Sequence, residues 1–151
     1  MEAASRDAER SLTVAGKKEV AEVAEGLLRL KVEAGCIATS PLKRAKETAI
    51  IAAHVLKKED RVESWDELRP EGDTNELYRR LSKLKRDSSV LLVGHEPYLS
   101  GMIGELISGT GRARIILKKA GVARVEVSTF VPKASGDLRW LMTPRQMKKI
   151  D

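Results

Sequence analysis

The most constraining feature of this sequence is a short unbroken apolar run, residues 90–93, that lies between Ser89 and Gly94. A run without alternating polar residues predicts a strand covered on both faces, as at the centre of a parallel sheet. Residues 35–39 predict a second buried strand, and residues 61–65 predict a shorter one. Strands of this kind need helices on both faces, so these runs favour an α/β fold.

Four helical patterns alternate with the strands, at about residues 14–31, 41–56, 74–84 and 98–108. Caps are predicted at Thr13, Ser40 and Thr74, because a side-chain oxygen at the N-cap accepts a bond from a free backbone N–H. Pro41 is predicted at the first position of the second helix, where a missing N–H has no cost.

In the last third of the chain, the alternation of strands and helices gives way to two predicted strands. Residues 122–127 and 137–142 predict paired strands around a turn at 133–136. The predicted fold class is therefore α/β with three layers, in which helices flank a mostly parallel sheet and an antiparallel C-terminal hairpin lies at its edge. The sequence has no repeat or long linker, so residues 1–151 are expected to form a single domain.

Composition bounds the remaining possibilities. Only five residues are aromatic, so the core must be built from valine, isoleucine, leucine and alanine. No apolar run reaches the length of a membrane span, and residues 1–7 do not resemble a signal peptide. A single cysteine, Cys36, cannot form an internal disulfide. Together these observations favour a cytoplasmic protein with no membrane partner.

The net charge of +6 is unevenly distributed along the chain. Residues 112–150 carry ten basic and two acidic side chains, whereas residues 1–111 carry eighteen basic and nineteen acidic ones. A basic C-terminal third could bind nucleic acid, an acidic partner or a phosphate substrate. Nucleic acid is disfavoured, because the region has few aromatic residues and no nucleic-acid motif. An acidic partner, or simple solubility, is the favoured interpretation.

Two of the predicted strands end in residues suited to phosphate chemistry. Ser40-Pro41 and Arg44 follow the first strand, and His95 follows the strand at 90–93. Ligands of open α/β sheets bind beyond the carboxyl ends of the strands, where a helix N-terminus and an arginine attract phosphate oxygens. Histidine can donate a hydrogen bond or carry a proton there. Singly, such an arginine is usually solvated and such a histidine usually structural, so only the combination predicts a site.

The combination Ser40-Pro41-x-x-Arg44-Ala45-x-x-Thr48, followed about fifty residues later by Val93-Gly94-His95-Glu96-Pro97, resembles the histidine phosphatase superfamily. It is most similar to the small phosphohistidine phosphatase branch, SixA. Residues 7–16, 67–73 and 140–144 also resemble this branch. The resemblance implies a phosphoglycerate mutase-like fold and a histidine nucleophile that is transiently phosphorylated.

The same resemblance assigns roles to three residues. It implies that Arg44 and His95 are catalytic and bind the phosphoryl group, and that Arg10 lines the entrance with further positive charge. The loop at 69–73 resembles the branch without a dedicated acid, with Glu71 as the alternative acid. No metal or cofactor is implied, and two distant histidines with one cysteine have no metal-ligand spacing.

One departure from the family pattern concerns the nucleophile. The family signature is an N-terminal strand ending in Arg-His-Gly, but the two histidines here, His54 and His95, follow Ala53 and Gly94. We therefore expect that the natural chain begins upstream of Met1, and that the sequence lacks its first strand and the nucleophile. If Met1 is the true start, we expect no turnover by the family route.

The sequence leaves several functions open. The favoured one is hydrolysis of phosphohistidine on a signalling or phosphotransfer protein, which would make such a protein the partner. The alternatives are a catalytically dead domain that binds phosphate or a phosphoprotein, and a phosphatase acting on a phosphorylated small molecule. The sequence predicts neither the substrate's identity nor the oligomeric state.

Overall fold

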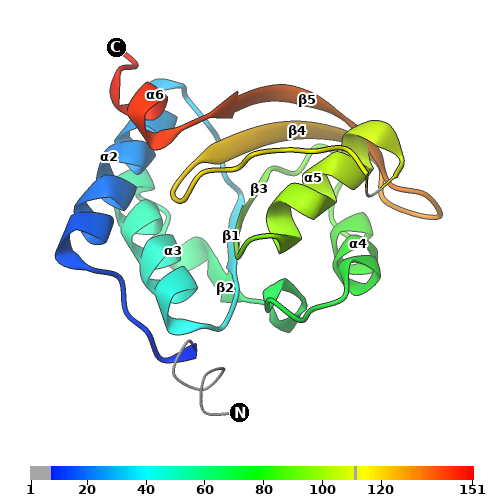
Figure 1. Ribbon diagram of the computed structural model, residues 1–151, viewed down its shortest axis with the longest axis horizontal. Helices are drawn as coiled ribbons and strands as arrows, with labels where there is room; N and C mark the ends of the chain where they lie inside the picture. Colours follow the sequence, from blue (N-terminus) through cyan, green and yellow to red (C-terminus); the bar gives the residue numbers. More distant parts are fainter. Residues whose placement is uncertain (1–7, 111) are drawn as a thin grey trace.

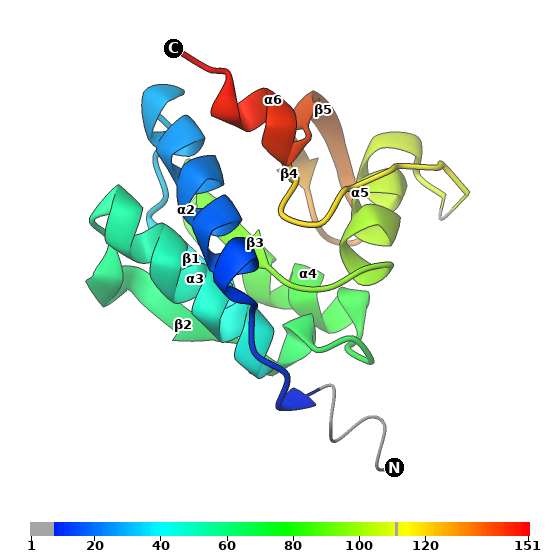
Figure 2. The same ribbon diagram turned by 60° about the vertical axis from the view of Figure 1, so that its left-hand side comes forward.

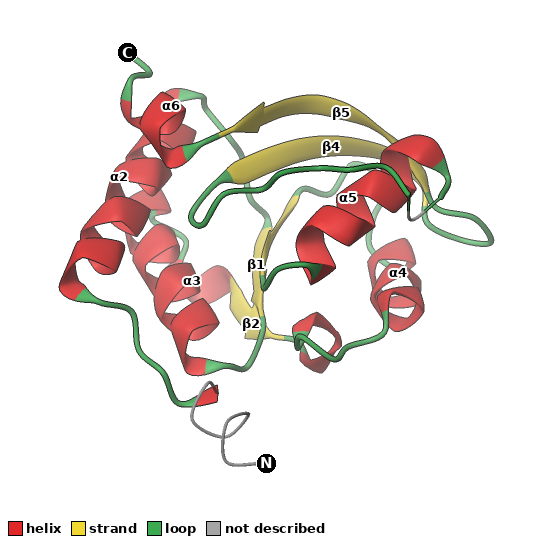
Figure 3. Ribbon diagram, in the orientation of Figure 1, coloured by secondary structure: helices red, strands yellow, loops and turns green. Residues whose placement is uncertain are grey.

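The computed structural model of the protein describes residues 8–110 and 112–151, in which helices and strands alternate as predicted (Figure 3). The helices are α2 (Val14–Arg29), α3 (Lys43–Leu56), α4 (Thr74–Ser82), α5 (Tyr98–Ser108) and α6 (Pro144–Lys148). The strands are β1 (Cys36–Thr39), β2 (Val62–Ser64), β3 (Val90–Val93), β4 (Val122–Thr129) and β5 (Ser135–Met142). Two short 3₁₀ turns, η1 (Glu59–Arg61) and η2 (Asp66–Leu68), flank β2.

The strands form two sheets, and the predicted fold class is confirmed. β1 pairs in parallel with β2 and β3, in the order β2-β1-β3, while β4 and β5 form an antiparallel pair. Figure 1 shows α2 and α3 on one side of the parallel strands and α4 and α5 on the other. None of the helices in the described residues is long and apolar enough to cross a membrane.

The position of the apolar run at 90–93 corrects a prediction. The run forms β3, but β1 rather than β3 is the central strand of the parallel sheet. Within the described part of the chain, β3 pairs only with β1, and its four residues are half-buried rather than buried. An apolar run indicates that a strand is buried, but it does not indicate which strands or helices bury it.

The two faces of β1 explain why helices lie on both sides. Ile37 packs against alanines of α3, and the next residue, Ala38, packs against a cluster that includes Trp65, Leu68 and residues of α4 and α5. Successive side chains of a strand point to opposite faces, so each face of β1 contributes to a different cluster. Both residues are fully buried, and they fix β1 and its carboxyl end in the middle of the domain.

A third cluster joins the two ends of the chain. Val23 and Leu27 of α2 pack with Leu56 of α3 and Met147 of α6. A Cβ atom at Gly26 would lie 2.7 Å from the Met147 carbonyl oxygen, so only glycine allows α2 and α6 to approach this closely. In Figure 2, α6 lies beside the upper half of α2.

Of the three predicted helix caps, the structure confirms Thr13, whose side chain accepts a hydrogen bond from the Gly16 N–H at the start of α2. The other two caps are formed by different residues. The N-cap of α4 is Asp73, whose carboxylate accepts from the Asn75 N–H, so Thr74 is the first helical residue. α3 begins at Lys43 with Leu42 as its N-cap. Ser40 does not cap α3, because it lies two residues before the N-cap and its N–H continues the pairing of β1 with β3.

Candidate active site at the ends of β1 and β3

The carboxyl ends of β1 and β3 bring the two predicted motifs together. Thr39 and Val93 are register partners, and the Ser40 N–H donates to the Val93 carbonyl at 2.9 Å. Two residues after Val93, His95 Nε2 lies 2.8 Å from Ser40 Oγ, a hydrogen bond whose donor depends on the histidine tautomer. Residues 55 positions apart in sequence therefore meet at one edge of the sheet.

Ser40 links the two motifs, although the sequence pattern predicted it only as a helix cap. Its side chain is fully buried, and Oγ also accepts from the Leu42 N–H at 3.2 Å. A hydroxyl has one donor and two acceptor sites, so Ser40 can bind the turn before α3 and the imidazole of His95 together. In the sequence, a serine directly before a proline is typical of a helix N-cap, so the pair predicted a cap rather than a contact with His95.

Arg44 lies in the first turn of α3, four residues after Ser40. Its side chain is half-buried, and its carbonyl accepts from the Thr48 hydroxyl at 2.9 Å, which braces the turn. The first helical bond of α3 is the one from the Lys46 N–H to the Leu42 carbonyl, so earlier N–H groups of the turn have no intrahelical acceptor. These N–H groups, the helix dipole and a guanidinium form a positive site suited to an oxyanion.

Arg10 lies on the exposed segment that leads into α2. The segment is tied to α3, because the Leu12 N–H donates to Glu47 Oε1 at 3.1 Å and Lys17 Nζ lies 3.4 Å from Glu47 Oε2. Glu47 is three residues beyond Arg44, so this tie holds the segment carrying Arg10 to the same helix. No described contact joins Arg10 to Arg44 or His95, and its place at the entrance stays a prediction.

We expect Glu47→Gln to lower stability at neutral pH and to lose this effect in acid. Partial burial alone raises the pKa of Glu47, but the Leu12 N–H and the charges of Lys17 and Lys43 outweigh it and lower the pKa. A carboxyl with a lowered folded-state pKa stabilises the fold above its unfolded pKa, and this contribution disappears as pH falls through the folded value. Thermal melts across the acid range would measure the difference between variant and wild type.

Glu33→Gln is the control for this experiment, because Glu33 is exposed. Its melting curve should follow that of the wild type at every pH. A Glu47→Gln deficit that persists unchanged in strong acid would contradict the assignment of the stabilisation to the charged carboxylate.

The loop after β2 is fixed by a separate set of contacts. Glu67 forms an ion pair with Arg80 at 3.0 Å, and its carbonyl accepts from the Tyr98 hydroxyl at 2.6 Å. The Arg80 guanidinium covers the ring of Trp65 at 4.2 Å. Glu67 is thus committed to the structure of the loop, whereas Glu71 is exposed.

Gly72 makes this loop compact. A Cβ atom there would come within van der Waals overlap of the Glu67 carbonyl oxygen, at 2.2 Å, and the Gly72 N–H donates to the Arg69 carbonyl. The loop can therefore turn back on itself only with glycine at this position.

The other candidate nucleophiles do not join the site. His54 is exposed on α3 and lies 3.2 Å from Glu59. Burial and the neighbouring carboxylate of Glu63 raise the pKa of the Cys36 thiol to about 12, and its Sγ donates to Glu63 Oε2 at 3.2 Å. A thiol with so high a pKa is a poor nucleophile. Within the described residues, no group of three His, Cys, Asp or Glu side chains is placed to hold a metal.

Comparison with known proteins identifies the family. Residues 3–73 match the histidine phosphatase superfamily (branch 1). An uncharacterized protein of Picosynechococcus sp. strain PCC 7002 is 33% identical over 121 residues, which are 78% of this chain and 72% of that protein.

Solved structures agree with this match. The structure of the protein histidine phosphatase SixA complexed with tungstate is 28% identical, with a TM-score of 0.83 over 94% of this chain and 89% of that one. The SixA structure from Agrobacterium tumefaciens shares the fold at 20% identity, with a TM-score of 0.70 over 92% of this chain and 86% of that one. The chain, whose two motifs meet through the hydrogen bond between His95 and Ser40, belongs to the histidine phosphatase superfamily.

Proposed function

We propose that this protein is a phosphohistidine phosphatase that removes phosphate from a phosphorylated histidine of a signalling or phosphotransfer protein. The observation that carries this proposal is the 2.8 Å hydrogen bond between His95 and Ser40, which joins the two motifs next to the start of α3, the helix that carries Arg44. A related structure was solved with tungstate, a tetrahedral oxyanion like phosphate. The positive site described above suits such an anion.

Arg44 and His95 would act on the charge of the transferred group. The transition state of phosphoryl transfer spreads charge over the equatorial oxygens, so a positioned guanidinium and an imidazole donor stabilise it. A histidine nitrogen attacks phosphorus while the bond from phosphorus to the substrate imidazole breaks, and the leaving imidazole takes a proton from water. Water then attacks the phosphorylated enzyme and releases phosphate.

We place the nucleophilic histidine on a strand that precedes Met1 in the natural protein. His54 is exposed on α3 and lies beside Glu59, and His95 is hydrogen-bonded to Ser40, so neither is suited to the attack. β3 supports a further strand, because its apolar residues are only half-buried and its one pairing partner among the described residues is β1. An unpaired strand edge is a template for another strand.

The test compares this chain with the product of its complete coding sequence. The substrate is a histidine-containing phosphocarrier protein phosphorylated with phosphoramidate, and released phosphate is measured. We expect the complete protein to release phosphate, and the 151-residue chain to bind tungstate without turnover. Turnover that survives both Arg44→Ala and His95→Ala would refute the site.

A second candidate function is a domain that binds a phosphoprotein without hydrolysing it. It is favoured by the absence of a suitable nucleophile among the described histidines. Tungstate binding without phosphate release by the complete protein would support it. The same assay with alkyl phosphates would separate a small-molecule phosphatase, for which the exposed Glu71 could serve as the acid.

A further inference from the structure

Residues 112–118, which precede β4, run as one extended stretch (Figure 1) and carry several basic side chains. Exposure alternates along it: Ala113, Ile115 and Leu117 are half-buried, and their neighbours are exposed. We call the outward residues, Arg112, Arg114, Ile116 and Lys118, the basic row. Period-two exposure is typical of an extended chain lying on a surface.

Ala113 brings the start of the row against α5. A Cβ atom at Gly104 of α5 would lie 2.8 Å from the Ala113 carbonyl oxygen, so the segment runs against that helix at close range. The backbone of Gly121 closes the far end by donating to the Lys118 carbonyl at 2.7 Å. The row is therefore presented on a fixed support.

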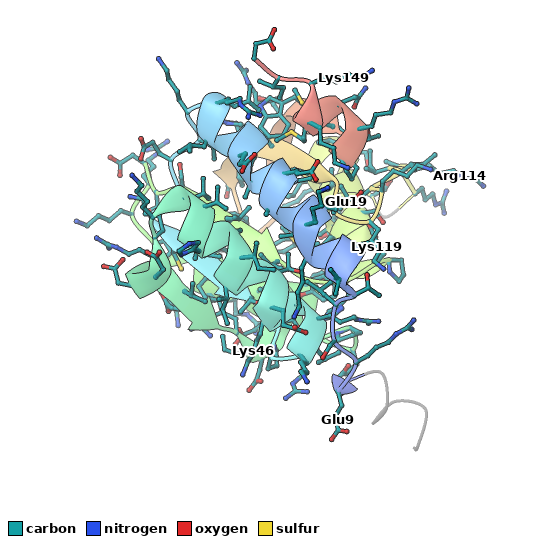
Figure 4. All side chains as sticks on the ribbon, turned by 90° about the vertical axis from the view of Figure 1, so that its left-hand side faces the viewer. Glu9, Glu19, Lys46, Arg114, Lys119 and Lys149 are labelled. Carbon is teal, nitrogen blue, oxygen red and sulfur yellow. The ribbon has the colours of Figure 1, made fainter. Side chains whose placement is uncertain are left out.

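The positive charge of the row is not neutralised within the described chain. No described acidic side chain lies within ion-pair distance of its arginines or lysine, whereas Arg139 pairs with Glu126 and Lys148 with Glu19. Figure 4 shows Arg114 at one side of the molecule, away from the end where Lys46 and Glu9 lie. The electrostatic field of these cations attracts an acidic partner.

Ile116 adds an apolar contact in the middle of the row. Its side chain is 76% exposed, between Arg114 and Lys118. A single exposed isoleucine is ordinary. An apolar residue flanked by arginine and other cations, however, is the arrangement that protein interfaces use, with an apolar centre and a charged rim.

The chemistry of the row favours a protein over the other anionic polymers. None of the five aromatic residues is exposed in the structure, so there is no platform on which bases could stack. The row is an extended segment with one exposed apolar residue, and it lacks the apolar face with which a helix enters a lipid surface. We propose that the basic row docks an acidic surface of the phosphohistidine-bearing protein. This inference rests on the proposed function, which makes the substrate a protein.

The test measures binding without turnover. The probe is fluorescently labelled poly-L-glutamate, and its anisotropy is followed at low ionic strength. We expect the double variant Arg114→Glu/Lys118→Glu to weaken binding by about tenfold or more, because steering by a charged surface is worth this much. The control Lys83→Glu/Arg86→Glu makes the same charge change on exposed residues after α4 and should weaken binding much less.

Ile116→Ser separates a docking surface from a diffuse field, because it changes no charge. We expect a severalfold loss of poly-L-glutamate affinity. Equal losses in the two charge-reversal variants, or no effect of Ile116→Ser, would overturn the proposal. So would tighter row-dependent binding of oligothymidylate or of phosphatidylserine vesicles than of poly-L-glutamate.

Tungstate affinity distinguishes this proposal from the proposed function. The basic-row variants should bind tungstate as the wild type does, and Arg44→Ala should keep its affinity for poly-L-glutamate. Loss of phosphate release with intact row-dependent binding would refute the proposed function alone. In the complete enzyme, the row variants should raise KM for the phosphoprotein and leave kcat unchanged.

Discussion

Arg44→Ala is expected to lower turnover of a phosphohistidine protein by the complete enzyme by about 10²–10³-fold, the usual cost of removing one donor to a developing oxyanion. The same variant of the 151-residue chain should lose most of its tungstate affinity by calorimetry. The reason is that, in the proposed site, the guanidinium of Arg44 in the first turn of α3 binds the anion together with His95. Arg44→Lys should rescue little, because an ammonium cannot offer the planar fork that matches two oxygens.

Lys46→Ala is the matched control for Arg44. Lys46 lies two residues further along the same helix and is exposed, so its loss removes the same charge from the same element. We expect it to change tungstate affinity little. Equal losses in the two variants would mean that general charge, rather than a positioned guanidinium, holds the anion.

His95→Ala is expected to cost about 10²-fold in turnover, and Ser40→Ala is expected to cost less and to act through His95. Ser40 is a positioning residue in this arrangement, since its hydroxyl contacts the imidazole of His95. Ser40→Ala should also lower the free energy of unfolding by about 1–3 kcal/mol, because it removes the buried acceptor of the Leu42 N–H.

A double-mutant cycle separates positioning from stability. If Ser40 acts by orienting His95, Ser40→Ala should have no further effect on tungstate affinity in the His95→Ala background. Thr39→Val is the control, since Thr39 is also buried at the end of β1 but donates to the Ser40 carbonyl rather than to His95. It should lower stability without lowering tungstate affinity. Additive effects of Ser40→Ala and His95→Ala would contradict the positioning role.

Much of the fold could be predicted because its signals are local. Apolar runs gave the strands β1, β2 and β3, and the Thr13 cap and the spacing of apolar residues gave α2 to within two residues. The hairpin of β4 and β5 followed from alternation around a turn. Secondary structure depends mainly on residues within a few positions of one another, so a single sequence carries these signals.

The same local signals gave a wrong prediction for Ser40, as a helix cap. A serine before a proline is a strong helix start, yet here its N–H continues the sheet by pairing with Val93 and its hydroxyl binds His95. Both partners are more than fifty residues away, and the pattern around Ser40 contains no trace of them. The tie from Glu47 to the Leu12 N–H, across 35 residues, was hidden for the same reason.

The sequence by itself determined that the protein is an α/β domain with an arginine and a histidine placed after two strands. These features follow from apolar periodicity and from the spacing of the residues in each motif. The tertiary structure alone decided that β1 rather than β3 is central, and that Ser40 links the two motifs through His95. Strand order and long-range hydrogen bonds are set by which surfaces are buried together, and burial is a property of the whole packed chain.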